Sequence, residues 1–186
     1  MTALFGGSFD PVHVGHLVAA EAAADALEMG VRFLPAREQP FKRAAHVAGP
    51  AQRAAMLTLA VAGNPRLGVE RIELDLPAPS YTVETLRALA VREPGGRRTL
   101  LLGADAAQDL PAWHEAGALP GLADIVVFAR PGSAVPRHAG ITRVIDVPAL
   151  DVSATLVRAL VAEGRSIRYL VPDAVREYIA AHGLYR

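Results

Sequence analysis

The chain has 186 residues, of which 52% are hydrophobic and 20% are charged. This composition is typical of a soluble globular protein and excludes a disordered chain. The 19 basic residues balance the 19 acidic ones, so the charge does not predict bulk binding to nucleic acid or to a membrane, and an anionic ligand must be held by local donors.

The absence of cysteine excludes disulfides and cysteine-based metal or redox chemistry. It is also typical of proteins in a reducing compartment. A first strand is expected by residue 3, which leaves no room for a signal peptide. No apolar run approaches the roughly 18 residues that a membrane-spanning helix needs. We therefore expect a cytoplasmic protein.

A strand-to-helix turn is predicted near the N terminus. The apolar run Ala3–Phe5 predicts a short strand, and a helix face with i, i+3, i+7 and i+10 spacing begins at Leu17. Between them lies the sequence GGSFDPVHVGH at residues 6–16. Its two adjacent glycines let the backbone approach a ligand, and the following helix aims its free N–H groups and positive dipole end at the turn. A phosphate group would bind well there.

Several interpretations of this turn stay open when it is considered alone. It has neither the G-x-G-x-x-G pattern of dinucleotide-binding turns nor the G-x-x-x-x-G-K-[ST] pattern of P-loops. A zinc site would need a third ligand, and no obvious one lies at a suitable spacing. His13 and His16 are expected on the same side of the first helical turn, with Gly15 leaving room beside both rings. Such an HxGH pattern is also compatible with a purely structural role.

A second strand is predicted at Val31–Pro35, and a polar, basic loop follows over residues 36–48. Lys42 lies in this loop, where exposure to solvent is the ordinary interpretation of a basic residue. A helix is then expected to begin at Gly49–Pro50. We expect its inward face to carry Met56, Leu59 and Ala60.

The middle of the chain predicts a further helix and a buried strand. Short strand-like pieces are expected within Leu67–Leu76, and a helix begins after Tyr81 with Thr82 as its N-cap. The continuous apolar run Thr99–Leu102 is typical of a strand buried on both faces. The inner face of the helix is expected to carry Val83, Leu86, Leu89 and Ala90.

The end of this buried strand is a candidate ligand site. The strand runs into Gly103, and Asp105 follows. A carboxylate just beyond the carboxyl end of a parallel strand lies where open α/β sheets bind their ligands. Trp113, the only tryptophan, comes next in a loop-rich stretch, and burial in the core is the ordinary interpretation of so large a side chain.

Two more strands are predicted at Ile125–Phe128 and Thr142–Ile145, and two helices are predicted to begin at Ser153 and Pro172. Strands that alternate with helices of about 10 to 15 residues predict right-handed crossovers and a parallel sheet covered on both faces. We therefore predict an α/β fold over residues 1–186 as a single domain, with a Rossmann-like doubly wound parallel sheet and a small C-terminal helical part. The first of these helices is expected to bury Leu156, Val157, Leu160 and Val161.

The chain also resembles one enzyme family over nearly its whole length. GGSFDPVHVGH at 6–16 and VSATLVR at 152–158 are similar to the signatures of the HxGH nucleotidyltransferase superfamily. The GAD sequence that ends at Asp105, with Trp113 eight residues later and SYT at 80–82, is similar to bacterial nicotinate-nucleotide adenylyltransferases. The further similar stretches are QPFK at 39–42, SYTVETL at 80–86, LLGADAAQDLPAW at 101–113, ARPG at 129–132 and the YLVP to GLY ending.

This resemblance implies transfer of the AMP part of ATP to nicotinate mononucleotide, which forms nicotinate adenine dinucleotide and pyrophosphate in NAD biosynthesis. The attacking phosphate has a second pKa of about 6, so it is largely dianionic at neutral pH and requires no general base. The enzyme must hold two anions in line and neutralise the charge that builds on the α-phosphate and on pyrophosphate. Mg²⁺ would arrive with ATP, held mostly by phosphate oxygens and water.

The resemblance also assigns the residues of the site. His13 and His16 are the expected catalytic donors and contact the triphosphate, whereas Trp113 is expected to stack on the nicotinate ring. Backbone N–H groups at the helix start near Tyr81 and Thr82 would favour the nicotinate carboxylate over a neutral amide. ATP is expected at Gly6, Gly7, Ser8, Phe9, His13, Gly15, His16, Ser153, Thr155 and Arg158, and nicotinate mononucleotide at Lys42, Tyr81, Thr82, Gly103, Asp105 and Trp113.

Two positions depart from the family pattern. Phe41 replaces the histidine of the usual PPHK loop, which removes one phosphate donor beside Lys42. Ala154 replaces the second serine of the usual ISSTxIR helix start, which removes one hydroxyl contact but leaves the backbone N–H groups. Thr155 keeps the hydroxyl of the family pattern, and Arg158 keeps its positive charge.

Two other functions are open. One is a different HxGH nucleotidyltransferase, with nicotinamide mononucleotide or phosphopantetheine as the acceptor; the stretch from GAD to Trp113 argues against phosphopantetheine. The other is a non-catalytic nucleotide-binding protein on the same fold. Retention of both histidines and of Arg158 argues against it. The expected partners are ATP and nicotinate mononucleotide, without nucleic acid or membrane, and homo-oligomerisation is left open.

Overall fold

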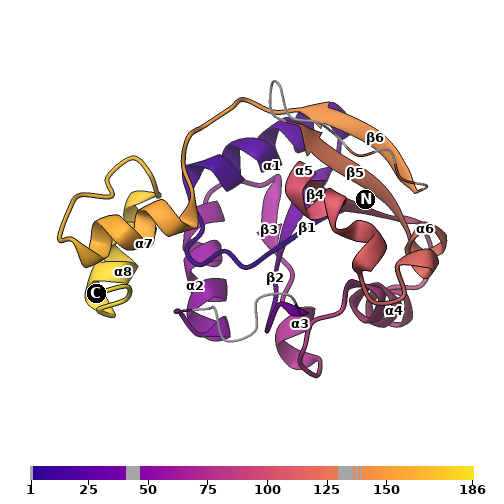
Figure 1. Cartoon of the computed structure of the whole chain (residues 1–186), viewed down its shortest axis with the longest axis horizontal. Coiled ribbons are helices and arrows are strands. Elements are labelled where there is room, and N and C mark those ends of the chain that lie inside the picture. The colour runs from indigo at the N-terminus through magenta and orange to yellow at the C-terminus, as the bar shows by residue number, and fades with distance from the viewer. Residues whose placement is uncertain (1, 41–46, 130–135, 137, 139) are drawn as a thin grey trace.

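A parallel β-sheet forms the centre of the fold (Figure 1). The computed structural model describes residues 2–40, 47–129, 136, 138 and 140–186. Six strands lie in the order β3-β2-β1-β4-β5-β6, and every neighbouring pair is parallel, which confirms the predicted Rossmann-like doubly wound sheet. The strands are β1 (Thr2–Gly7), β2 (Gly30–Pro35), β3 (Leu67–Val69), β4 (Arg98–Gly103), β5 (Ala123–Ala129) and β6 (Ile141–Asp146).

Helices cover both faces of this sheet. Short 3-10 turns at Leu110–Ala112 and Ala116–Ala118 join two of them. Within the described residues, no helix combines the length and the hydrophobicity that crossing a bilayer requires. The helices are α1 (Val14–Leu27), α2 (Pro50–Val61), α3 (Ile72–Asp75), α4 (Thr82–Arg92), α5 (Ala104–Gln108), α6 (Leu119–Leu122), α7 (Ala154–Ala162) and α8 (Asp173–Ala181).

Alternate residues of the central strands enter two separate cores. Phe5 of β1 and Leu101 of β4 face the core beneath α1 and α2, whereas Leu4 and Leu100 face the core beneath α4, α5 and α6. All four side chains are buried, because a strand between two helical layers alternates between two apolar environments. Burial on both faces of the sheet explains why residues 99–102 form a continuous apolar run.

The last two helices form the predicted small C-terminal part and lie at one end of the sheet, beside α2 (Figure 1). Ser153 caps α7 as predicted, since its Oγ accepts a hydrogen bond from the Leu156 N–H at 3.1 Å. The inner faces of α7 and α8 extend the core beneath α1 and α2, through Val157, Leu160, Val175 and Ile179.

Some local predictions were wrong. Only Leu67–Val69 of the expected strand pieces forms a strand, and Ile72–Asp75 is the short helix α3. Glu70 explains the change, because its carboxylate accepts the Ile72 N–H at 2.9 Å and satisfies a donor at the helix start. Three residues expected on inner helix faces, Leu59, Ala90 and Leu156, are exposed instead.

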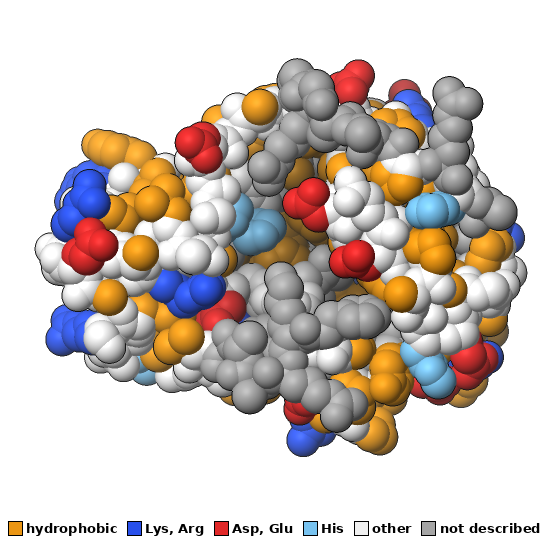
Figure 2. Space-filling view, viewed as in Figure 1, with side chains coloured by type: hydrophobic (Ala, Val, Ile, Leu, Met, Phe, Trp, Pro, Cys, Tyr) orange, Lys and Arg blue, Asp and Glu red, His pale blue; other side chains and the backbone are white. Residues whose placement is uncertain are grey.

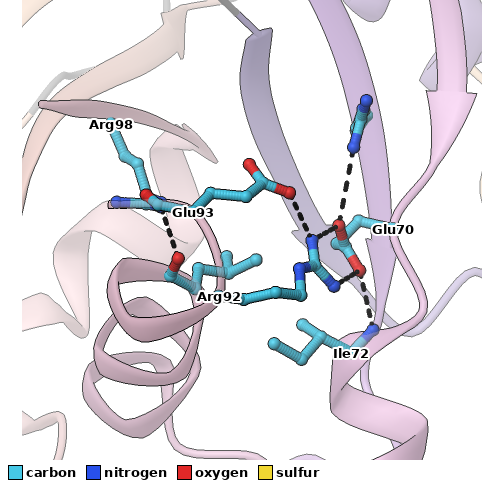
Figure 3. A network of polar contacts seen from close by, with 7 residues as sticks. Glu70, Ile72, Arg92, Glu93 and Arg98 are labelled. Carbon is cyan, nitrogen blue, oxygen red and sulfur yellow. Dashed lines mark hydrogen bonds and ion pairs between the residues drawn. The ribbon is translucent and has the colours of Figure 1, made fainter. Parts of the chain in front are cut away.

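An ion-pair network around one buried carboxylate joins the end of β3 to the last turn of α4 (Figure 3). Glu70 is 5% exposed, and its carboxylate accepts hydrogen bonds from Arg92 and from the Ile72 N–H. Arg32 of β2 lies 3.7 Å from the same carboxylate. Burial raises the pKa of Glu70, but the hydrogen bonds from Arg92 and Ile72 outweigh it, so the pKa lies below its usual range.

We predict that Glu70→Gln lowers the free energy of unfolding by about 1–3 kcal/mol at neutral pH, as expected for lost hydrogen bonds to a buried charged group. A carboxyl with a depressed pKa contributes fully above its unfolded pKa of about 4.3 and loses that contribution as the pH falls through its folded pKa. Urea unfolding of wild type and variant at several pH values should show a difference that shrinks on acidification below about pH 4.

Glu93→Gln is the matched control, because Glu93 is exposed and pairs with the same Arg92 at 2.8 Å. Its effect should stay below about 0.5 kcal/mol. Equal effects of the two substitutions would contradict the role given to burial at Glu70.

Candidate active site

The turn from β1 to α1 lies at the point where the strand order of the sheet reverses. β1 pairs with β2 on one side and with β4 on the other. In doubly wound sheets, ligands bind in the crevice that such a reversal opens at the carboxyl ends of the strands. The motif GGSFDPVHVGH therefore occupies the expected ligand position of the fold.

Phe9 shapes this turn from within the core. Its φ of 51° is left-handed, and its ring lies over Gly7, where a Cβ atom would stand 2.8 Å from the Phe9 Cζ. The ring also meets the His16 ring edge-to-face, with 5.0 Å between centroids. Phe9 is 2% exposed, so its side chain supports the turn and the His16 ring.

The two histidines stack at the start of α1, which begins at Val14 as expected. Their ring centroids are 3.7 Å apart, with 28° between the ring planes. His16 Nδ1 accepts the backbone N–H of His13 at 3.2 Å, as a glutamate does in a capping box. Because Nδ1 accepts, Nε2 carries the proton of the neutral imidazole and is the nitrogen that can donate.

Gly15 gives the histidines their room, as predicted. A Cβ at this position would stand 3.0 Å from Val152 Cγ1 and 3.1 Å from His13 Nδ1. The segment before α7 therefore packs directly against the HxGH turn.

The second predicted phosphate-binding segment is tied to the same turn. Arg158 donates from Nη1 to the Asp10 carbonyl oxygen at 2.7 Å and from Nη2 to Thr155 Oγ1 at 3.2 Å. The N terminus of α7, capped by Ser153, thus lies beside the N terminus of α1. The structure brings together two motifs that stand about 140 residues apart in the sequence, and two helix N termini favour anions there.

Asp10 is a structural centre that sequence reasoning did not single out. Its buried carboxylate accepts the N–H groups of Val47 at 2.8 Å and Ala48 at 3.1 Å and the hydroxyl of Tyr185 at 2.7 Å. Burial and the Asp10 hydrogen bond raise the pKa of Tyr185. Asp10 lies in the motif at 6–16, and Tyr185 lies in the GLY ending. Their places in two family motifs were the only sequence evidence for this contact.

Arg53 of α2 was also missed. It is fully buried, and its guanidinium donates to the carbonyl oxygens of Ser8 at 2.6 Å and Ala36 at 2.6 Å. Burial lowers the pKa of Arg53, and the charge of Asp10 opposes that shift. The available signal was its position three residues before Met56, which places a cation on the inward face of the helix.

A cavity of about 640 Å³ opens at the carboxyl edge of the sheet. Figure 2 shows a hollow in this face of the molecule, with histidine and acidic side chains around it. Gly103 lies next to the cavity as the N-cap of α5, and Lys42 lies outside the described residues. Of the residues predicted to bind either substrate, Gly6, Gly7, Tyr81, Thr82, Asp105 and Trp113 line this cavity.

The cavity combines an aromatic wall with a helix start. Trp113 is half-buried and packs against the core beneath α4, and the ring of Tyr81 lies 4.4 Å from that of His114. Tyr81 is the N-cap of α4 in place of the predicted Thr82, and its side chain makes no capping hydrogen bond. The backbone N–H groups of this first turn can therefore bind an anion in the cavity.

The buried carboxyl of Glu73, from α3, also lines the cavity. Its Oε1 accepts the Thr85 hydroxyl at 2.8 Å. Burial raises its pKa to about 6, against hydrogen bonds from Thr85 and Ser80 and the charge of Arg53. The site therefore has two halves that meet at Gly6 and Gly7: the HxGH turn with its stacked histidines and a cavity with an aromatic wall.

Comparison with known proteins agrees with this geometry. The model of the cytidylyltransferase-like family matches residues 4–160. A relative from Roseiflexus castenholzii, named "Probable nicotinate-nucleotide adenylyltransferase", is 48% identical, covering 100% of this chain and 98% of its own. A Thermus thermophilus relative with the same name is 45% identical, covering 98% of each chain. The nicotinic acid mononucleotide adenylyltransferase of Plasmodium falciparum, solved in complex with NaAD, has the same fold, with a TM-score of 0.78 at 18% identity over 99% of this chain and 96% of its own.

These matches define the class first: the chain is a nucleotidyltransferase. The chain belongs to the cytidylyltransferase-like family and, within it, to the family of nicotinate-nucleotide adenylyltransferases.

We predict that Gly15→Ala lowers kcat for pyrophosphate release by about tenfold to a hundredfold, because the added Cβ displaces the His13 ring, which we expect to contact the triphosphate, and displaced catalytic groups have effects of that size. The measurement is steady-state kinetics with ATP and nicotinate mononucleotide. Gly117→Ala is the control, since its added Cβ meets nothing within 4 Å. Full activity of the Gly15 variant would contradict the close packing at this turn.

Proposed function

We propose that the protein transfers the AMP part of ATP to nicotinate mononucleotide, forming nicotinate adenine dinucleotide and pyrophosphate. The observation that carries this proposal is the junction of two half-sites at Gly6 and Gly7, with the stacked HxGH histidines on one side and the cavity on the other. Such a junction suits two anionic substrates held end to end. The names of the relatives support the same reaction.

The triphosphate binds at the HxGH turn in this proposal. His16 Nε2 donates to a phosphate oxygen, and the N termini of α1 and α7 supply backbone N–H groups and positive dipole ends. Arg158, held by the Asp10 carbonyl, adds a fixed positive charge. These donors stabilise charge that builds on the α-phosphate and on the leaving pyrophosphate. Mg²⁺ enters as part of the MgATP substrate and supplies further neutralisation of the phosphates.

Nicotinate mononucleotide occupies the cavity. Its carboxylate lies at the first turn of α4 by Tyr81 and Thr82, where backbone N–H groups prefer an anion, and its ring stacks on Trp113. The phosphate then points toward Gly6, where even an added Cβ would meet nothing within 4 Å. Because this phosphate is largely dianionic at neutral pH, it attacks without a general base. A cytoplasmic location stays a prediction, and homo-oligomerisation stays open.

The role of His16 predicts that His16→Ala lowers kcat by about a hundredfold or more, the usual effect of losing one preorganised donor to a transition state. The fold should survive, as judged by circular dichroism and thermal unfolding. His182→Ala, which removes an exposed imidazole from the C-terminal end of α8, is the control and should keep wild-type kcat. A folded His16 variant with most of its kcat would refute the donor role.

Substrate choice is tested by pyrophosphate release from MgATP, with nicotinate mononucleotide and nicotinamide mononucleotide run side by side. We expect a kcat/KM for nicotinate mononucleotide about fivefold higher or more, since one carboxylate at a helix start contributes roughly 1 kcal/mol. Equal rates would contradict the anion site at α4. Release with neither acceptor would favour another acceptor, such as phosphopantetheine, or a non-catalytic nucleotide-binding protein.

A further inference from the structure

Three loops meet at the carboxyl edge of the sheet, and the buried guanidinium of Arg53 joins two of them. It reaches the loop after β1 through the Ser8 carbonyl and the loop after β2 through the carbonyls of Ala36 and, at 3.1 Å, Arg37. Its Nε also donates to the Ala48 carbonyl at 3.2 Å. One fully buried side chain thus fixes the turn beside the HxGH histidines relative to the next loop of the site.

Ser80 joins the second of these loops to the third, which leads into α4. Its Oγ accepts the Arg37 N–H at 2.9 Å, and its own N–H donates to the Glu38 carbonyl at 2.9 Å. The Ser80 side chain also lies near the buried carboxyl of Glu73 and opposes the rise that burial causes in the pKa of that group. The Glu73 carboxylate accepts the hydroxyl of Thr85, in the first turn of α4, at 2.8 Å.

These bonds form one continuous network, which we call the bridge: Ser8, Arg53, Arg37, Ser80, Glu73 and Thr85. It begins at the turn proposed to bind triphosphate and ends at the helix start proposed to bind the nicotinate carboxylate. Its supporting helices, α2 and α4, cover opposite faces of the sheet (Figure 1). The bridge therefore crosses from one helical layer to the other around the carboxyl edge.

Burying the two charged side chains of the bridge costs free energy, and a contribution to folding stability does not explain why they are there. Arg53 is 0% exposed and Glu73 is 5% exposed, and desolvation disfavours the charged form of each. Buried ionic groups can often be replaced by apolar residues without loss of stability, whereas they define one geometry more strictly than apolar contacts do. In-line transfer between two bound anions demands one strict geometry.

We infer that Arg53 and Glu73 are positioning residues, which hold the two half-sites in the register that aligns the mononucleotide phosphate with the α-phosphate of ATP. This inference rests on the proposed adenylyl transfer. It assigns neither residue a contact with the reacting atoms. Each substrate still binds through its own local donors when the bridge is cut, but the two reacting groups no longer meet in line.

The test uses Arg53→Lys, Glu73→Gln and Ser80→Ala in the full chain. Each variant should lower kcat about tenfold to a hundredfold, while the separately measured Kd values for ATP and for nicotinate mononucleotide change less than about threefold. If the three act through one bridge, Arg53→Lys combined with Glu73→Gln should lower kcat by clearly less than the product of the single effects.

A matched control comes from the amino edge of the sheet. Arg98 is the first residue of β4 and donates to the carbonyls of Leu89 at 2.5 Å and Glu93 at 2.9 Å. Arg98→Lys should lower the thermal unfolding temperature and leave kcat unchanged. Ser80→Ala removes a single hydroxyl, so the test holds even where Arg53→Lys fails to fold.

Each result decides between distinct ideas. Formation of nicotinate adenine dinucleotide by wild type is measured first, and its absence overturns the proposed function and this inference with it. With an active wild type, unchanged kcat in the folded bridge variants overturns the positioning role alone. The positioning role is also overturned if the Kd values of the substrates rise by the same factor by which kcat falls. It is overturned as well if the double variant lowers kcat by the full product of the two single effects.

Discussion

The carboxylate of Asp10 is the constraint on which the rest of the site depends. A buried carboxylate must be surrounded by donors, and the donors here come from Val47, Ala48 and Tyr185, far apart along the chain. The backbone oxygen of the same residue receives Arg158 of α7. The turn after β1, the segment before α2, the start of α7 and the C-terminal end therefore have to converge. These contacts of Asp10 therefore also fix the position of the HxGH histidines, which lie in the same turn.

The chain has no net charge, so its affinity for anions depends on where donors point. The hydrogen bond from His13 N–H fixes the His16 tautomer, and Arg158 is held by a carbonyl. Both groups are set before a ligand arrives, which is what stabilisation of developing charge requires. The Phe9 ring completes the arrangement, because it lies over Gly7 and meets the His16 ring edge-to-face.

Sequence reasoning located the strands, the sheet class and the HxGH turn, because hydrophobic periodicity and helix capping are local signals. The rule that ligands bind at the carboxyl ends of parallel strands predicted Asp105, which lines the cavity. Tyr81 and Trp113 line the same cavity, and these two were predicted only from the family resemblance. Sequence reasoning missed Arg53 and Asp10 because their partners lie up to 175 residues away. It misjudged Leu59 and Leu156 because the width of a buried helix face depends on the neighbouring elements, which periodicity does not reveal.

The two half-sites differ in the ligand chemistry that their residues offer. The HxGH turn brings together two helix N termini and Arg158, which suit a group with several negative charges. The cavity offers Trp113 and one helix start, which suit an aromatic ring with a single carboxylate. In the proposed reaction, the cavity would therefore select the base and the turn would bind the phosphates. The buried hydrogen bonds of Arg53 between the two loops would then hold both bound groups in one geometry.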